Sequence, residues 1–249
     1  MTARFAYLLR LGDTALVLGH RLAEWCGSGP TPEEDIALAN IGLDLTGQAT
    51  AWLDLAGAAE GKGRDADALA YFRDGTDFRN LLLAEQPNED FGHTMVRQML
   101  FDAWHVELLG GLERSADAGI AAVAAKARRE AEYHWRRSSD WVVRLGDGTE
   151  QSHARVAESL VRLWPFTGEM FARDAVVAEL VTEGIAPEPA PLLQAWNRRV
   201  DAILTEATLT RPADGWMQSG GLEGRHGEAL GHLLAEMQSL ARQHPGAKW

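Results

Sequence analysis

The sequence is poor in features that mark several common functional classes. It has one cysteine, Cys26, among 249 residues, which excludes an internal disulfide and any cysteine-rich zinc or iron–sulfur site. Basic residues are also scarce, because 24 lysines and arginines stand against 36 acids and the formal net charge is −12. Such a charge gives no general attraction to nucleic acid or to an anionic membrane surface. The single cysteine is typical of a reducing compartment, and we expect a cytoplasmic protein.

Long uninterrupted hydrophobic runs are missing too. The segment from Phe5 to Cys26 is rich in leucine, but charged residues interrupt it at Arg10, Asp13 and Arg21. It therefore fits neither a signal-peptide core nor a membrane span, and we expect a buried helix. No segment alternates apolar and polar residues over the length of a strand, whereas apolar residues recur at spacings of three and four. The sequence predicts an all-α fold.

Capping and turn residues divide the chain into helices. We expect long helices at residues 3–26, 32–60, 90–115 and 118–145, short helical pieces at 65–73 and 78–85, and further helices at 150–182, 191–209 and 228–243. The long helices form two hairpins joined by one long crossover, which is the topology of a ferritin-like four-helix bundle. We therefore predict a single ferritin-like domain over residues 1–249, with core hairpins at 3–60 and 90–145 and accessory helices at 150–243.

Polar residues interrupt the apolar faces that the long helices turn inward. A rise of 1.5 Å per residue places Asp44 at the level of Asp13 in the first hairpin, and Glu130 near the level of Asp102 in the second. The spacing therefore predicts one polar layer at mid-bundle. Asp13 shares its side of the helix with Arg10, so that face could instead be solvated or paired with another chain. The predicted layer comprises Asp13, Asp44, Gln48, Gln98, Asp102, His105, Glu130 and His134.

This layer lies where ferritin-like proteins bind two metals, through a Glu from each of two helices and a Glu-x-x-His pair from each of the other two. Both pairs are broken here. Leu45 and Gln48 stand where a ligating Glu and His would be, and Ala131 stands three positions before His134. Glu130 is four positions before His134, which offers only unusual ligand geometry. We predict a hydrogen-bonded network with no metal, and direct metal ligation is the alternative.

Several long motifs resemble, in order, those of one bacterial protein family. They are Arg10–Gly27 (RLGDTALVLGHRLAEWCG), Leu38–Ala49 (LANIGLDLTGQA), Leu81–Asn88 (LLLAEQPN), Asp102–His105 (DAWH), Leu234–Leu240 (LAEMQSL) and Pro245–Trp249 (PGAKW). With them, the chain is similar from end to end to the C subunits of bacterial phenylacetyl-CoA epoxidases. The resemblance implies a ferritin-like fold and tight pairing with the catalytic A subunit, which carries the di-iron site.

The same resemblance implies a set of partners and a reaction. Together with the B subunit and a flavin and iron–sulfur reductase, the complex uses NADPH and O2 to epoxidise the aromatic ring of phenylacetyl-CoA. The C subunit is regarded as structural, which agrees with the broken ligand pairs. We therefore expect a hetero-oligomeric subunit that is not catalytic by itself, holds no cofactor, binds neither nucleic acid nor membrane, and serves aerobic phenylacetate catabolism.

Two alternatives stay open beside the scaffold role. One is a self-sufficient, ferritin-like, metal-dependent oxidase, and the other is a helical binding module unrelated to oxygenation. In the oxidase, the metal ligands would be Asp44, Asp102, His105, Glu130 and His134.

Two further motifs carry weaker signals. The pairs Arg128-Arg129 and Arg136-Arg137 could steer an acidic partner subunit or a coenzyme A phosphate, or could form an ordinary solvated helix face. The glycine-rich run at 220–227 follows no strand and lacks a phosphate-loop lysine, so we interpret it as a mobile loop.

Overall fold

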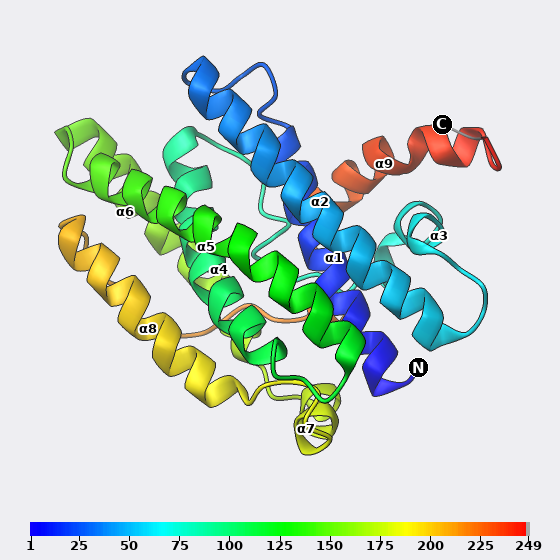
Figure 1. Cartoon of the computed structure of the whole chain (residues 1–249). Coiled ribbons are helices and arrows are strands. Elements are labelled where there is room, and N and C mark those ends of the chain that lie inside the picture. Colours follow the sequence, from blue (N-terminus) through cyan, green and yellow to red (C-terminus); the bar gives the residue numbers. More distant parts are fainter. Residues whose placement is uncertain (248–249) are drawn as a thin grey trace. The chain divides into compact units, whose positions relative to one another are not determined.

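The computed structural model describes residues 1–247, and every regular element in that range is a helix (Figure 1). The prediction of an all-α fold is confirmed. Lys248 and Trp249, which end the last matching motif, lie outside the described residues. The α-helices are α1 (Ala3–Ala23), α2 (Pro32–Glu60), α3 (Ala66–Tyr71), α4 (Phe91–Leu112), α5 (Ala118–Gly146), α6 (Glu150–Leu163), α7 (Ala175–Thr182), α8 (Pro189–Glu206) and α9 (Glu228–Gln243). Short 3-10 helices lie between them, namely η1 (Gly75–Asp77), η2 (Trp164–Phe166), η3 (Gly168–Phe171) and η4 (Gly221–Glu223).

Most of the long helices begin at residues that satisfy their free backbone amides. Thr31 accepts a hydrogen bond from the backbone amide of Glu34 at 3.4 Å, and Pro32 follows as the first residue of α2. The same helix ends at Gly61, whose φ of 70° lies in the left-handed region that favours glycine. Asp117 caps α5 in a similar way. These local signals explain why the predicted bounds of the long helices are confirmed to within a few residues.

The described helices fall into two compact units, and the first combines residues 1–87 with the C-terminal segment that begins at Gly220. Here α1 and α2 pack as a hairpin, and α3 and α9 complete the unit. A Cβ added to Gly19 or to Gly42 would lie 3.1 Å from the other residue's carbonyl oxygen, so the two helices approach closely there. Nearly all of α1 is buried, including Arg10 and Asp13. The interpretation of that face as solvated is therefore wrong.

The second unit comprises residues 88–219 and is built around the hairpin of α4 and α5. Both α6 and α8 pack against α4, most of whose residues are buried. Trp196 of α8 anchors this packing, because its indole nitrogen donates a 2.9 Å hydrogen bond to the carbonyl oxygen of Leu100. Each unit thus contains one of the two predicted hairpins. The single ferritin-like domain that would join them stays a prediction.

The segment at residues 78–85 differs from the prediction, because it forms a loop with one turn in place of a short helix. Its backbone amides are bound by side chains of α1. The amide of Arg79 donates to Asp13 at 2.8 Å, and that of Leu81 donates to Thr14 Oγ1 at 3.1 Å. Backbone groups that are paired with side chains are not available to close helical turns.

The single helix predicted at 150–182 is also wrong. The chain forms α6, then η2 and η3, and then α7 over this stretch. The first helix ends at Leu163 because Pro165 has no backbone amide and its ring clashes with a continuing helix. Asp174 starts α7 anew by accepting a 3.0 Å hydrogen bond from the backbone amide of Val177.

Candidate functional site

Four polar side chains gather between the two long helices of the second unit. Asp102 and His105 come from α4, and His134 and Ser138 come from α5. All four residues are at most 5% exposed. The hydroxyl of Ser138 donates a 2.7 Å hydrogen bond to Oδ2 of Asp102. Because spacings of three and four keep side chains on one face of a helix, each pair points to the same interface. We call these four residues the α4–α5 cluster.

Burial sets the protonation states in the α4–α5 cluster. It raises the pKa of Asp102 to about 6, although nearby His134, the hydrogen bond from Ser138 and the charge of Arg137 act in the opposite direction. Burial, together with the neighbouring His134, lowers the pKa of His105 to about 3. His105 is therefore neutral at physiological pH. The carboxyl group of Asp102 changes its charge close to neutrality, so the cluster can hold or release a proton.

Several buried polar atoms in and next to the α4–α5 cluster have no hydrogen-bond partner within the described part of the protein. Gln98 precedes Asp102 by about one helical turn and is 1% exposed. Within the described residues, both amide atoms of Gln98, Oδ1 of Asp102 and Nδ1 of His105 have no hydrogen-bond partner. Buried polar atoms without partners lower stability, so the predicted network is less complete than its composition suggested.

The remaining members of the predicted polar layer lie in different surroundings. Asp13 belongs to the first unit, where it accepts two hydrogen bonds from the guanidinium of Arg73, one of them at 3.0 Å. Gln48 is buried in the same unit, whereas Asp44 and Glu130 are only half-buried. The structure thus brings Asp102, His105 and His134 together and binds Asp13 elsewhere. One layer that spans both hairpins stays a prediction.

A buried carboxylate that the sequence analysis did not identify lies in the first unit. Glu85 is 1% exposed and accepts hydrogen bonds from the side chain of Asn80 at 3.0 Å, from His226 at 2.8 Å and from the amide of Gly227 at 2.7 Å. The glycine-rich run at 220–227, interpreted above as a mobile loop, is therefore anchored to the core. No local pattern could have predicted this contact, because Glu85 and His226 are 141 positions apart.

His226 is held from both sides of its ring. Nδ1 faces Glu85, and Nε2 lies 3.0 Å from the carbonyl oxygen of Phe78, so both ring nitrogens must donate. Burial alone lowers the pKa of His226. The hydrogen bonds to Glu85 and Phe78 and the charges of Glu85 and Asp13 outweigh burial and raise that pKa above its usual value. The ring of His226 thus joins the buried side chain of Glu85 to the backbone of Phe78.

The donor set does not fit a metal pair. Leu45 and Ala131, which stand at positions where the ferritin-like pattern would place metal ligands, are fully buried apolar residues that offer no lone pair. Gln48, at a third such position, offers only a neutral and weak ligand atom. Among the described residues, no group of three or more His, Cys, Asp or Glu side chains is arranged to hold a metal ion. The α4–α5 cluster can exchange a proton, but it lacks the carboxylates that bridge two metals.

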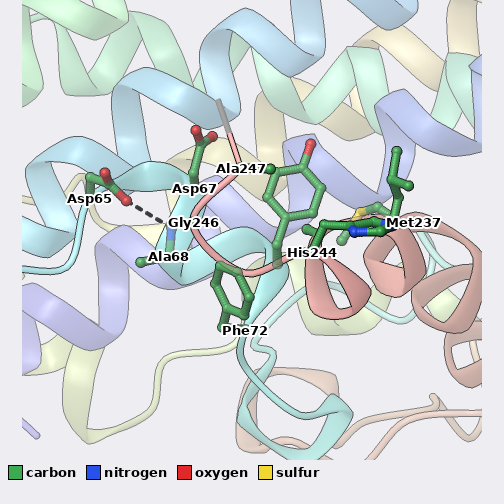
Figure 2. Close-up of a pocket in the computed structure, with 11 residues that line it drawn as sticks. Asp65, Asp67, Ala68, Phe72, Met237, His244, Gly246 and Ala247 are labelled. Atoms are coloured by element: carbon green, nitrogen blue, oxygen red, sulfur yellow. Dashed lines mark hydrogen bonds between the residues drawn. The ribbon is translucent and has the colours of Figure 1, made fainter. Parts of the chain in front are cut away.

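A pocket of about 490 Å³ lies in the first unit between α3 and α9 (Figure 2). Its floor and walls include Tyr71, Phe72 and Leu240, and the last two are about half exposed. Figure 2 shows Asp65 on the α3 side, where one of its oxygens accepts a 2.8 Å hydrogen bond from the amide of Ala68. That bond caps α3. The pocket is therefore an apolar hollow with an acidic edge, remote in the sequence from the α4–α5 cluster.

Comparison with known proteins decides the family. The whole chain, residues 1–249, matches the family model described as phenylacetic acid catabolic protein. The chain belongs to the phenylacetic acid catabolic protein family. One member of similar sequence is the C subunit of the 1,2-phenylacetyl-CoA epoxidase of Escherichia coli (strain K12), which is 50% identical over 244 residues. The match covers 98% of this chain and 98% of that relative.

Membership in the phenylacetic acid catabolic protein family confirms the resemblance that the motifs indicated. The family is helical and ferritin-like, in agreement with the all-α structure. The related E. coli protein belongs to a phenylacetyl-CoA epoxidase, as its name states, and it is one subunit of several. In the described part of the chain, no helix combines the length and the apolar character that crossing a bilayer requires.

Proposed function

We propose that this chain is the structural, non-catalytic C subunit of a phenylacetyl-CoA epoxidase, and that it supports a di-iron catalytic A subunit. The observation that carries the proposal is the presence of Leu45, Gln48 and Ala131 at three positions where the ferritin-like ligand pattern would require Glu or His. The 50% identity to the C subunit of the E. coli enzyme, over nearly the whole chain, supports the same role. The complex also includes a B subunit and a flavin and iron–sulfur reductase, and it works in the cytoplasm.

In this role, the buried polar residues serve the fold. The polar residues allow α4 and α5 to pack in only one register. If one helix shifted along the other, Asp102 or His134 would lie against apolar side chains. Ser138 and Asp102 hold α4 and α5 together in this way. The bound di-iron group of the partner supplies the oxygen chemistry, whereas this chain supplies a stable surface on which the partner folds and remains soluble.

Reconstitution with the A subunit tests the proposal. This chain and its A subunit are purified separately and together, and NADPH- and O2-dependent epoxidation of phenylacetyl-CoA is measured with the B subunit and reductase present. We expect no activity from this chain without the A subunit and full activity from the pair. Activity of this chain without the A subunit would establish the self-sufficient oxidase. Failure to bind the A subunit, together with co-purification of an unrelated protein, would establish a binding module.

A further inference from the structure

A row of buried polar side chains runs along one face of α4. Gln98, Asp102 and His105 follow one another at spacings of four and three, so they lie within about 60° of arc on the helix. Their exposed fractions are 1%, 1% and 5%. The helix rises about 6 Å from Gln98 to Asp102 and about 4.5 Å from Asp102 to His105. We call these three residues the α4 polar row.

The hydroxyl groups of the neighbouring helix do not satisfy the whole row. Ser138 donates to Oδ2 of Asp102 at 2.7 Å, which leaves Oδ1 of the same carboxyl group without a partner among residues 1–247. Ser139 donates to a backbone carbonyl oxygen of its own helix at 3.0 Å. The pair of Asp102 and Ser138 fixes the register of the antiparallel hairpin, so the buried residue of α5 at the level of Gln98 is Val142. The side chain of valine offers no hydrogen bond to an amide.

Four polar atoms of the α4 polar row are therefore buried without a hydrogen bond from the described chain. They are both amide atoms of Gln98, Oδ1 of Asp102 and Nδ1 of His105. A native fold keeps few such atoms, because each has lost its hydrogen bonds to water and gained none in return. Four of them within two turns of one helix indicate that a small molecule binds there.

The donors and acceptors of the row fit water better than an ion. The amide of Gln98 presents two N–H donors beside its acceptor oxygen, and a cation bound to that oxygen leaves the donors unsatisfied. The row holds one carboxyl group, and no set of three or more potential metal ligands occurs in the described chain. An ionised Asp102 repels an anion. Water both donates and accepts, so it can bind all four atoms.

We propose that the α4 polar row binds enclosed water, with about one molecule between each two successive members. A water that makes two hydrogen bonds of about 2.8 Å joins atoms about 5.6 Å apart, which is close to the rise between members of the row. One water bridges the amide of Gln98 and Oδ1 of Asp102. The second bridges the same carboxyl group and Nδ1 of His105.

Enclosed water suits both protonation states of Asp102. The ionised carboxylate accepts a hydrogen bond from the water, and the protonated carboxyl group donates one to it. The water is not bulk solvent, because each member of the row is at most 5% exposed. The inference goes beyond the proposed function, since it says what binds on a helix of the bundle in which ferritin-like proteins hold metals.

A crystal structure of the full-length chain at about 1.5 Å resolution tests the proposal directly. We expect water density within about 3.2 Å of at least two members of the row, and no anomalous signal at the iron or zinc absorption edge. In Gln98→Leu, the water bound to the amide should be gone while α4 and α5 keep their positions. A direct hydrogen bond between Gln98 and Asp102, with no water beside either side chain, overturns the proposal.

Water relaxation in solution gives a count that does not depend on a crystal. The oxygen-17 relaxation dispersion of water reports molecules that stay inside a protein for longer than nanoseconds. Gln98→Leu should hold about one long-lived water fewer than the unchanged chain. The matched control is Gln194→Leu, which makes the same substitution at an exposed position of α8 and should leave the count unchanged.

The melting temperature of Gln98→Leu distinguishes a hydrated amide from a bare one. A bare buried amide destabilises the fold, so leucine in its place would raise the melting temperature. Loss of a hydrated amide leaves Asp102 and its water with one partner fewer, and we expect the melting temperature to fall by about 2–4 °C. A rise in this variant contradicts the proposal.

The remaining outcomes separate this inference from the proposed function. If the row shows no water density and Gln98→Leu leaves the water count unchanged, the hydration site is wrong while the proposed function stands. An anomalous metal peak at the row overturns both, because a bound metal contradicts the supporting role as well. Reconstitution that fails with the A subunit, in a chain whose row holds water, overturns the proposed function alone.

Discussion

Asp13 and Arg73 are 60 positions apart in the sequence and form an ion pair in the core of the first unit. Their side chains are 0% and 3% exposed. The amide of Arg79 donates a third hydrogen bond to the same carboxylate, and the guanidinium of Arg73 lies 4.4 Å from the centre of the Phe78 ring. The pair therefore ties α1 to the crossover that follows α3.

Breaking this pair should destabilise the chain strongly. Asp13→Ala leaves a buried guanidinium without its counter-ion, and we expect the free energy of unfolding to fall by about 3–5 kcal/mol. The double variant Asp13→Leu/Arg73→Met should lose less than the sum of the single variants, because no buried charge remains. Urea unfolding measures the free energy of unfolding of the single and the double variants. Arg162→Ala, which removes an exposed pair with Glu89, is the control and should change stability by less than about 1 kcal/mol.

Asp102 should make stability depend on pH. Burial raises its pKa to about 6, so the folded state holds the proton more tightly than the unfolded state does. The stability that this proton provides is complete below the ordinary pKa of an aspartate and is lost as pH rises through about 6. Asp102→Asn stays neutral, and relative to it the unchanged chain should lose up to about 3 kcal/mol between pH 4 and pH 8. Parallel pH profiles in denaturant unfolding would contradict the assignment.

Removal of the Asp102 side chain tests the same interface at a fixed pH of about 4, where the Asp102 carboxyl group is protonated in the folded state. Asp102→Ala leaves the hydroxyl of Ser138 without its carboxylate acceptor and opens a cavity between α4 and α5. We expect the free energy of unfolding to fall by about 2–3 kcal/mol. An unchanged melting temperature would show that the α4–α5 cluster is solvated.

His226 should stabilise the chain most at low pH. Its pKa is raised above the usual value, so its contribution is complete below the pKa of an unfolded histidine and is lost as pH rises through the folded value. The destabilisation caused by His226→Gln should therefore be larger at pH 6 than at pH 9. The comparison variant is His232→Gln, which alters a side chain that is 78% exposed. An equal loss of stability at both pH values would show that His226 is neutral in the folded state.

Two glycines of α2 should respond in opposite directions to replacement by alanine. A Cβ at Gly57 would lie 2.0 Å from the carbonyl oxygen of Arg64, so Gly57→Ala should destabilise the turn after the helix. At Gly47 nothing lies within 4 Å, and Gly47→Ala should raise the free energy of unfolding by about 0.5–1 kcal/mol through helix propensity. The melting temperatures of both variants are compared with that of the unchanged chain. A higher melting temperature for Gly57→Ala would contradict the close approach of Gly57 to the carbonyl oxygen of Arg64.

Capping and turn residues in the sequence predicted the helix bounds, because these bounds depend mainly on neighbouring residues. The structure gives α9 its predicted bounds of Glu228–Gln243, and Thr31 and Gly61 delimit α2 as expected. These caps survive in any tertiary context that preserves the helices. Counting residues along the second hairpin placed Glu130 near the level of Asp102, but the side chain that reaches Asp102 in the structure is Ser138, about two turns further along α5.

Long-range partners explain what the sequence could not predict. Asp13 was expected to face Asp44, but its partner is Arg73 from the crossover, and no periodic pattern links those positions. The loop at 78–85 has helical propensity, yet its amides are bound by α1. His226 reaches Glu85 across 141 positions. In each case a buried polar group selects its partner through the tertiary fold.

The metal content of this chain alone tests the central claim most directly. The purified chain is loaded with ferrous iron without oxygen, desalted, and analysed for iron by mass spectrometry, in parallel with Glu130→Ala and His134→Ala. Because Leu45, Gln48 and Ala131 cannot complete a di-iron ligand set, we predict less than about 0.1 iron per chain and no difference among the three proteins. Two irons per chain, lost in either variant, would contradict the supporting role proposed for it.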